Sequence, residues 1–504
     1  MKRRAIVPKS DGTCDWPSDD EALLEVRDSR ESGASDYWSL RDAFEGVQVF
    51  GGTGSGKSSG SGQALARAFL SSNFGGLVLT AKTDEATAWK KMATEEGREA
   101  DVIDVTVGGP YEFNFLRYEL NRPGAGAGHT ESLVNLFCAV LESAEKRQGQ
   151  MGGGDAYWNR ALRQLLRNAI DLSIMATDDV DLAALYQIIS SAPTSREEAR
   201  DKSWQDSSIC FELLQQAQAR HTEGERAEDL KLVAAYFLRE FAGLANETRS
   251  VIVSTFTSMA DCFMRGVLRK LFCKGLNYSP DDCFDGKIII LNLPVKEFNE
   301  LGQFAQVLFK FVWQRAVERR IPEGISREEA QRTIRPVFLF ADESQFFVNS
   351  YDALFQSTAR SSRACTVYLT QNLPTYFSVF GGPNGRHEAE SFLGNLQTKI
   401  AHANGDPTTN LWIADTIGRT RQIQLSGGIS DGTTGYGKTS MNQSAGANMV
   451  FEYPVQPAEF TMLATGGPDH DFEVESIIFQ GGRNWSPNGE KPRNFIRHSF
   501  SQKS

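Results

Sequence analysis

Apolar and polar positions follow one another in blocks that predict an α/β core. Short, almost continuous apolar runs are typical of strands covered on both faces. They recur at residues 47–50, 76–80, 101–105, 287–293, 337–341, 366–370, 398–401 and 474–479. The early runs alternate with stretches in which apolar residues fall on one helical face. This rhythm predicts an α/β fold with a mostly parallel central sheet.

The apolar spacing changes in the middle of the chain. From residue 119 to residue 275 it becomes helical, after a Gly-rich linker at 122–128, so we expect an inserted all-α domain there. Residues 424–447 are rich in Gly, Ser and Thr without a clear period, and predict a flexible loop. The expected organisation is an N-terminal arm (1–40), a core in two parts (41–118 and 276–482) around the helical domain (119–275), and a basic C-terminal tail (483–504).

Composition excludes several classes of protein. With 504 residues, 40% of them apolar, the chain can bury large cores and is not mostly disordered. No run of about 18 apolar residues is present, so we expect no membrane-spanning helix, and the basic start at residues 2–4 is followed by acidic residues rather than by the apolar stretch of a secretory signal. The seven cysteines and six histidines are scattered, which favours reduced thiols and disfavours a zinc site. The net charge of −11 disfavours a protein that coats nucleic acid non-specifically, so any nucleic acid would have to bind at a local patch or in a pore.

Residues 51–58 carry the strongest chemical signal, with the pattern G-x-x-x-x-G-K-S. Glycines allow successive backbone N–H groups to surround a phosphate, and a helix behind them adds its positive end. Lys57 would then reach the β- and γ-phosphates of ATP, while Ser58 would bind Mg²⁺. The alternative is a Gly-rich turn that matches by chance, but an apolar strand precedes this segment and an amphipathic helix pattern follows it. The expected nucleotide-binding residues are Gly51, Gly52, Thr53, Gly54, Ser55, Gly56, Lys57, Ser58 and Ser59.

The same pattern occurs a second time, at residues 432–439, where it reads G-x-x-x-x-G-K-T. Here neither a strand pattern before it nor an amphipathic helix pattern after it is present. We interpret this copy as part of the flexible loop rather than as a phosphate site.

Two carboxylates follow the apolar run at 337–341. At the carboxyl end of such a strand, Asp342 would hold Mg²⁺ and Glu343 would orient and deprotonate the attacking water. Such a pair can also be a solvated strand end, but the phosphate loop upstream favours the catalytic interpretation.

Three further residues are candidates near the next strand. Gln371 ends that strand, where it could contact both the γ-phosphate and the water, or could be an ordinary polar strand end. Arg360 and Arg363 precede the strand, and either could cross a subunit interface to neutralise charge on a neighbour's nucleotide. An ordinary surface or DNA-facing arginine is the alternative. An arginine that acts on a neighbouring subunit's nucleotide predicts a closed head-to-tail ring.

These residues together resemble the TraG/TraD-like coupling ATPases of type IV secretion, which belong to the FtsK–HerA group of RecA-like P-loop motors. The resemblance spans roughly residues 44–482 and rests on ordered segments. They are residues 50–58, the Lys82 segment 79–85, residues 340–343, Arg360, Gln371, residues 392–400 with 417–418, and residues 460–463 with 466–467. Thr80 stands where the family usually has an Asp, and Ala359 where it usually has a Gly.

The resemblance implies a RecA-like core that hydrolyses ATP with Mg²⁺ as a homo-hexamer and pumps DNA through its pore. It also implies partners among membrane-anchored secretion or relaxosome proteins. Members usually carry N-terminal membrane helices, whereas this sequence predicts none. We therefore expect a cytoplasmic protein, or one held at the inner face of the membrane by a partner. Three alternatives stay open: a protein-substrate or assembly ATPase of a secretion machine, a soluble HerA-like DNA translocase of mobile-element or defence biology, and a nucleotide-gated binding module without turnover.

Overall fold

A computed structural model describes residues 16, 18–29, 35–124, 126–147, 155–434, 438–485 and 493–503. Within these residues a nine-stranded sheet forms the centre, in the order β13-β12-β9-β3-β8-β7-β4-β6-β5. The strands from β9 to β5 are parallel, and β12 runs antiparallel to both β9 and β13. The expected mostly parallel α/β sheet is therefore confirmed.

The strands have the following bounds: β1 Ala22–Arg27, β2 Ser35–Ser39, β3 Val47–Phe50, β4 Gly75–Leu79, β5 Val102–Val105, β6 Ile288–Leu291, β7 Val337–Ala341, β8 Ala364–Thr370, β9 Thr398–Ala401, β10 Thr420–Thr434, β11 Lys438–Glu452, β12 Glu473–Gln480 and β13 Phe495–Ser501. The helices that surround the sheet are α1 Leu40–Phe44, α2 Gln63–Ser71, α3 Glu85–Glu95, α13 Val295–Arg319, α14 Arg327–Thr333, α15 Ser350–Ala359, α16 Leu373–Phe380, α17 Gly385–Asn395 and α18 Pro407–Ile417. Between β5 and β6 lie α4 Phe115–Asn121, α5 Thr130–Arg147, α6 Asp155–Thr177, α7 Leu182–Ser191, α8 Lys202–Ser207, α9 Ile209–Arg220, α10 Glu225–Ala235, α11 Asn246–Met264 and α12 Gly266–Phe272.

The central strands are apolar on both faces because helices cover both faces. On β7, Phe338 lies in a cluster with Phe69 of α2 and Trp89 of α3, at ring distances of 5.4 and 5.6 Å. Leu339, the next residue, belongs to a second cluster that includes Trp313 of α13. Alternate residues of a strand point to opposite faces, so the continuous apolar run fills two cores at once.

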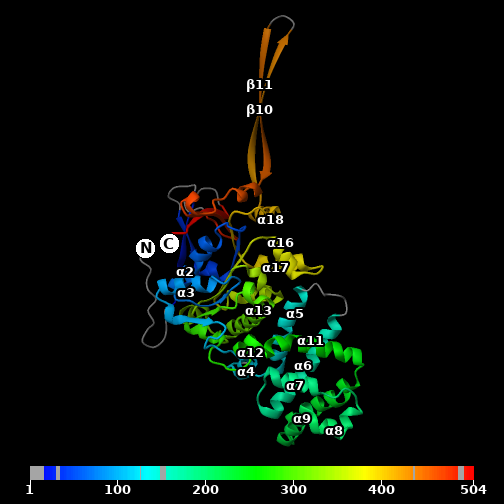
Figure 1. Ribbon diagram of the computed structural model, residues 1–504. Coiled ribbons are helices and arrows are strands. Elements are labelled where there is room, and N and C mark those ends of the chain that lie inside the picture. Colours follow the sequence, from blue (N-terminus) through cyan, green and yellow to red (C-terminus); the bar gives the residue numbers. More distant parts are fainter. Residues whose placement is uncertain are drawn as a thin grey trace.

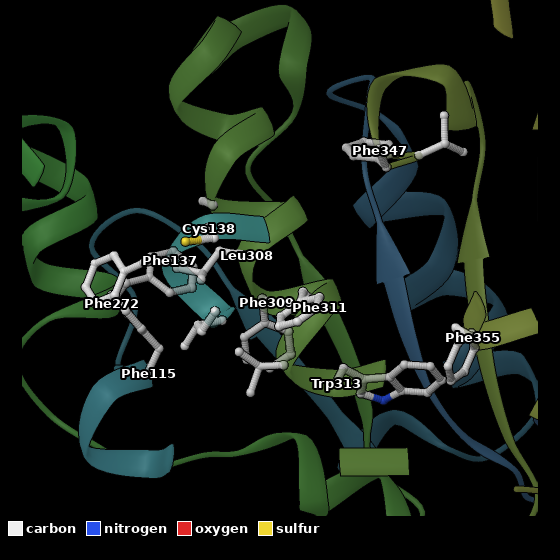
Figure 2. Packing of buried hydrophobic residues seen from close by; sticks show 14 of the residues in the cluster. Phe115, Phe137, Cys138, Phe272, Leu308, Phe309, Phe311, Trp313, Phe347 and Phe355 are labelled. Carbon is white, nitrogen blue, oxygen red and sulfur yellow. The ribbon is translucent and has the colours of Figure 1, made fainter. Parts of the chain in front are cut away.

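The segment between β5 and β6 is the expected helical insert, and Figure 1 shows it as a separate lobe below the sheet. Helix α13 connects this lobe with the core. Figure 2 shows Phe309 of α13 on the side of the insert residues Phe115 and Phe137, and Trp313 on the side of Phe355. The rings of Phe115 and Phe137 lie 5.8 Å apart, and those of Trp313 and Phe355 6.0 Å apart. The helices of the insert and the sheet thus share one hydrophobic cluster.

A buried polar network fixes α13 against the core. Lys310 forms an ion pair with Asp352 at the start of α15, and its ammonium also donates to the carbonyl of Phe347 over 2.8 Å. Gln314 and the Tyr368 hydroxyl donate to the other Asp352 oxygen, over 2.8 and 2.9 Å. Asp352 and Lys310 are both fully enclosed, so each depends on the other for its charge.

The two ends of the described chain correct the sequence expectations. Residues 22–27 and 35–39, expected in an N-terminal arm, form β1 and β2, which pair antiparallel, and β2 ends in the Ser39 cap of α1. Residues 495–501, expected in a basic tail, form β13 at the edge of the main sheet. Arg483 and Arg497 make ion pairs with Asp42 and Glu459, respectively, so basic residues of this segment neutralise acidic neighbours. Residues 1–15 of the expected arm lie outside the described residues.

The largest correction concerns residues 424–447, expected as an irregular loop. Residues 424–434 lie in β10 and residues 438–447 in β11, and these strands pair antiparallel in continuous register from Thr420↔Glu452 to Thr434↔Lys438. Residues 435–437 lie outside the described residues. Figure 1 shows this hairpin projecting from the body beyond α18. No helix within the described ranges is both long and apolar enough to cross a bilayer.

Candidate nucleotide-binding site

The strand order places most of the sequence-predicted residues at one edge of the sheet, the one formed by the carboxyl ends of its parallel strands. Strand β8 lies between β3, which leads into the phosphate loop, and β7, which leads into the carboxylates. All three strands are parallel, so their carboxyl ends meet at the same edge. Residues 51–59, 342–343 and 371 are thereby brought together, although the whole helical insert lies between residue 59 and residue 342 along the chain.

The phosphate loop has the backbone that its glycines allow. Gly54 and Gly56 have φ values of +75° and +78°, a region that other residues rarely adopt. A Cβ on Gly56 would also come within 2.7 Å of Val474 on β12. Behind the loop, a π-helical turn at Ser58–Gly62 runs into α2, so a helix amino terminus faces the loop. Ser55 Oγ is buried here without a hydrogen-bond partner in the described structure, which suits a site that accepts a polar ligand.

Residues just beyond β9, together with β12, support the loop from the other side. Gly52 N–H donates to the Ala403 carbonyl over 2.9 Å. His402 contacts Ser61 through Nε2 over 2.7 Å and the Glu475 carbonyl through Nδ1 over 2.9 Å. Burial lowers the pKa of His402 to about 4, so the ring is neutral near pH 7.

Ser58 and Asp342 form the candidate Mg²⁺ site. Ser58 Oγ donates to Asp342 Oδ2 over 2.6 Å, which places a hydroxyl and a carboxylate oxygen side by side. Oxygen donors of this kind are what Mg²⁺ prefers, and it usually takes only one or two of them from the protein, with water and phosphate oxygens completing its shell. The donor set therefore fits Mg²⁺.

Glu343 occupies the position expected of a catalytic base. Its backbone is left-handed (φ 48°, ψ 46°), an uncommon conformation for this residue type that turns the chain sharply after β7. Lys57 Nζ lies 3.7 Å from Oε1, and Gln345 Nε2 donates to Oε2 over 2.9 Å. Burial raises the pKa of Glu343, but the Gln345 hydrogen bond and the charges of Lys57 and Lys82 outweigh burial and hold it below its usual value. The carboxylate is therefore ionised near pH 7 and able to accept a proton.

Gln371 lies beside Glu343, as its position at the end of β8 predicts. Its Nε2 is 3.3 Å from Glu343 Oε2, and its Oε1 accepts from Thr53 Oγ1 of the phosphate loop over 3.3 Å. Asn404 holds the Gln371 carbonyl over 2.9 Å. Gln371 thus joins the phosphate loop to the carboxylate, which is the geometry that a sensor of the γ-phosphate needs.

Lys82 lies in the segment 79–85, which carries part of the family resemblance, but the sequence assigned it no role in the site. It follows β4, the neighbour of β7, and its Nζ lies 3.2 Å from both Asp342 Oδ2 and Glu343 Oε1. Burial opposes the charge of Lys82, but these carboxylates and Glu85 raise its pKa overall. Burial, and then the charge of Asp342, raise the pKa of Glu85 to about 8. Two sequence signals were available: Lys82 belongs to the segment 79–85 of the family resemblance, and it lies just beyond a strand that ends at the same edge.

A pocket of about 400 Å³ opens beside these residues, between α2 and α3. Ser58, Lys82, Glu85 and Asp342 line its polar side. Trp89 and Met92 of α3 contribute to its apolar side.

Arg360 and Arg363 come just before β8, so they lie at the amino-terminal ends of the parallel strands, opposite the nucleotide site. Because β8 has seven residues, this edge is about 23 Å from Gln371. Arg363 is 4% exposed, pairs with Asp19 and covers the ring of Phe44, so it is not available to a neighbouring subunit. The Arg360 side chain is half exposed and pairs with Glu45 over 3.1 Å. Of the two, only Arg360 can reach another molecule, and it cannot reach the nucleotide site of its own chain.

The second match to the phosphate-loop pattern has a different structure. Residues 432–434 end β10, and Lys438 and Thr439 begin β11. A strand follows Lys438 where a phosphate loop requires a helix, which supports the interpretation that this copy is not a nucleotide site.

Comparison with known proteins identifies the fold. A family model described as the TraM recognition site of TraD and TraG matches residues 336–450. The plasmid coupling protein TrwB with ADP and Mg²⁺ is 16% identical over 93% of this chain and 87% of that chain, with a TM-score of 0.55. The fold is that of a conjugative coupling protein.

Two further coupling-protein structures agree. TrwB with a non-hydrolysable ATP analogue covers 97% of both chains at 15% identity and a TM-score of 0.54. The trigonal form of TrwBΔN70 with sulphate covers 92% of this chain and 87% of that one, at 15% identity and a TM-score of 0.56. A search with the sequence among curated proteins found no match. The fold and the family match confirm the resemblance to TraG/TraD-like coupling ATPases and the RecA-like P-loop core.

Proposed function

We propose that this protein is an ATP-hydrolysing motor that translocates DNA, of the conjugative transfer or type IV secretion coupling type. One observation carries the proposal: the 2.6 Å hydrogen bond between Ser58 and Asp342, with Lys57 and Glu343 beside it. Phosphoryl transfer to water requires a phosphate-binding lysine, Mg²⁺ ligands and a base close together, and this site has a candidate for each. TrwB, which has the same fold, has been observed with ADP and Mg²⁺ and with an ATP analogue.

Each residue has a defined task in this reaction. The backbone of residues 51–58 and the Lys57 ammonium bind the phosphates and stabilise the charge that develops on them. Ser58 and Asp342 would hold Mg²⁺, which neutralises phosphate charge when bound. Glu343 accepts a proton from the attacking water through its carboxylate, and Gln371 orients that water and senses the γ-phosphate. The Lys82 ammonium contacts both Asp342 and Glu343 and helps to keep Glu343 ionised.

Arg360 completes the proposed site from a neighbouring subunit. Its position at the edge opposite its own nucleotide site means that it could act only in trans. A residue that acts across a head-to-tail interface requires a ring, and we propose a homo-hexamer. On assembly, the ion pair with Glu45 would be exchanged for contact with the neighbour's phosphate.

The proposed substrate is DNA in the pore of this ring, and the proposed partners are relaxosome or membrane-anchored secretion proteins. Support comes from the family description, which names a TraM recognition site in TraD and TraG and matches residues 336–450 here. The proposed location is the cytoplasm, at the inner face of the membrane when a partner is bound.

ATP turnover measured with and without DNA tests the proposal. We expect single- or double-stranded DNA to raise turnover at least about fivefold, because translocation couples hydrolysis to DNA contact. Negative-stain images of the same sample should show rings. Turnover that DNA leaves unchanged, but that secretion-machine proteins stimulate, would favour the assembly ATPase instead. Tight ATP retention without turnover would favour the binding module.

A further inference from the structure

A cavity of about 310 Å³ lies where the helical lobe meets the core. Helices α4, α5 and α6 of the lobe and α13 and α15 of the core contribute residues to its wall. It shares no lining residue with the pocket beside the candidate magnesium site. Its charged lining residues are Glu119, Arg163, Arg315 and Arg319. Three cations around one anion, in a chain with a net charge of −11, indicate a local preference for a negatively charged ligand.

The neighbouring carboxylates do not balance these cations. Glu119 Oε1 lies 2.8 Å from Arg122 Nη2, and both side chains are buried, so this pair is close to neutral. Glu318 balances Arg315 over 3.3 Å. Arg319 Nη2 lies 3.7 Å from Glu119 Oε2, beyond hydrogen-bond distance. Arg319 therefore shares a carboxylate that Arg122 already neutralises.

Arg163 adds a second positive charge without a matching carboxylate. Its Nη1 donates to the side-chain oxygen of Asn135 over 2.7 Å, and this acceptor is neutral. Burial lowers the pKa of Arg319, and the charge of Glu119 opposes this shift without cancelling it. The ionised form of Arg319 is thus less favourable here than in water, and an anion in the cavity would stabilise it.

Two buried donors of the cavity lack hydrogen-bond partners within the described structure, Arg319 Nη2 and Asn349 Nδ2. Asn349 is 8% exposed, and its Oδ1 accepts from the Tyr351 N–H over 3.0 Å, which identifies the remaining atom as the amide nitrogen. Buried polar atoms rarely lack a partner. Both atoms are donors, so the partner that fits is an acceptor. Asn349 also precedes α15, whose positive amino-terminal end favours an anion at this place.

We propose that this cavity binds a phosphate group, with Arg163 of the lobe and Arg319 of α13 as its charged contacts and Asn349 as a neutral donor. A phosphate with about two negative charges near neutral pH matches the two unbalanced arginines, whereas a carboxylate carries one. Guanidinium groups also bind phosphate oxygens through paired hydrogen bonds. A ligand held by both arginines would link the lobe to the core. Free phosphate compounds and DNA strands both carry this group, and the experiment distinguishes these two sources.

Binding of pyrophosphate and of a fluorescent dT oligonucleotide tests the site. Calorimetry and fluorescence anisotropy, respectively, measure binding to the full-length chain carrying Lys57→Ala, which weakens the phosphate loop as a competing site. Arg319→Gln and Arg163→Gln each remove one proposed charge from this background. Arg167→Gln is the matched control, because Arg167 lies one turn further along α6, pairs with Glu131 and does not line the cavity.

We expect Arg319→Gln to weaken pyrophosphate binding at least about tenfold and Arg163→Gln at least about threefold, since each removes a charge-assisted hydrogen bond, while Arg167→Gln changes it less than about twofold. Arg163 is partly exposed, so its variant carries the test if circular dichroism shows that Arg319→Gln does not fold.

A parallel loss of oligonucleotide binding would identify a DNA strand as the source of the phosphate, and a loss for pyrophosphate alone would identify a free phosphate compound. Unchanged binding of both probes in the two cavity variants would overturn the proposal. A triglutamate peptide that binds as tightly as pyrophosphate would overturn the assignment to phosphate. None of these measurements requires ATP turnover, so their outcome is independent of the proposed motor activity.

Discussion

Two segments of this chain read G-x-x-x-x-G-K-[ST], and the structure gives them opposite surroundings. Residues 51–58 leave a fully buried parallel strand, turn through Gly54 and Gly56, and enter a helix. The described residues of the second segment, 432–434 and 438–439, end one strand and begin the next in an antiparallel pair that projects from the body. The first Lys lies beside the carboxylate of Glu343, while the second is level with Thr434.

The difference shows that a phosphate site is made by the flanking elements. The strand directs the loop to the edge where Asp342 lies, and the helix directs its N–H groups at the ligand. Without them, the same residue types lie in a two-stranded antiparallel ribbon. Variants at equivalent positions of the two segments can break or sharpen this comparison.

The largest effect is expected for the two lysines. Lys57→Ala should lower ATP turnover at least about 1,000-fold, because it removes a buried cation that stabilises phosphate charge. Lys438→Ala should change basal turnover less than about twofold. Steady-state phosphate release measures both. A comparable loss in the two variants would mean that the hairpin segment also binds nucleotide.

The proposed base comes next. Glu343→Gln should lower turnover about 100-fold or more while nucleotide affinity stays within a few fold, because a neutral amide keeps the shape but accepts no proton. Single-turnover kinetics and equilibrium binding of a fluorescent ATP analogue separate these effects. The exposed Glu328→Gln is the matched control. Turnover at the wild-type rate in Glu343→Gln would remove the base assignment.

A smaller effect is expected for the residues that follow the two lysines. Ser58→Ala should raise the Mg²⁺ concentration for half-maximal turnover about tenfold, since one oxygen ligand is lost. Thr439→Ala should leave the Mg²⁺ dependence unchanged. Magnesium titrations of ATP turnover provide the measurement, and an unchanged value in Ser58→Ala would exclude that hydroxyl as a ligand.

The smallest effect concerns His402, which supports the phosphate loop. Its folded pKa of about 4 lies below the ordinary 6.5, so the unfolded chain binds the proton more readily. This contribution to stability is complete above about pH 6.5 and is lost as the pH falls towards 4. Between pH 7 and 5.5 the difference amounts to about 1 kcal/mol in the free energy of unfolding. Denaturant titrations at both pH values should show a smaller loss in His402→Gln; an equal loss would contradict this role.

The parallel core was predictable because each of its strands is an apolar run between turn signals. Asp342, Glu343 and Gln371 follow such runs directly, so their meeting at one edge follows from the fold class. Lys82 and His402 were harder to find, since their roles depend on which strands are neighbours. No local pattern specifies that β4 lies beside β7 or that β9 lies beside β3.

The peripheral strands were missed for a different reason. In β13, Ile496 and Phe500 alternate with polar residues, but the basic charge of the segment suggested a tail. In β10 and β11, Gly and Ser fill many positions, and both have low strand propensity, so the alternation of Ile423, Leu425 and Ile429 was obscured.

The Lys310–Asp352 pair affects how a movement at the nucleotide site could be transmitted to the helical lobe. If α13 slid by one turn, the ion pair would break while both charges stayed buried, and the folded structure would be destabilised by several kcal/mol. The ion pair therefore fixes α13 at one position along its axis. A displacement that begins near Phe347, five residues beyond the proposed magnesium ligand Asp342, would therefore move the helical lobe as a rigid body, because α13 cannot slide to absorb it.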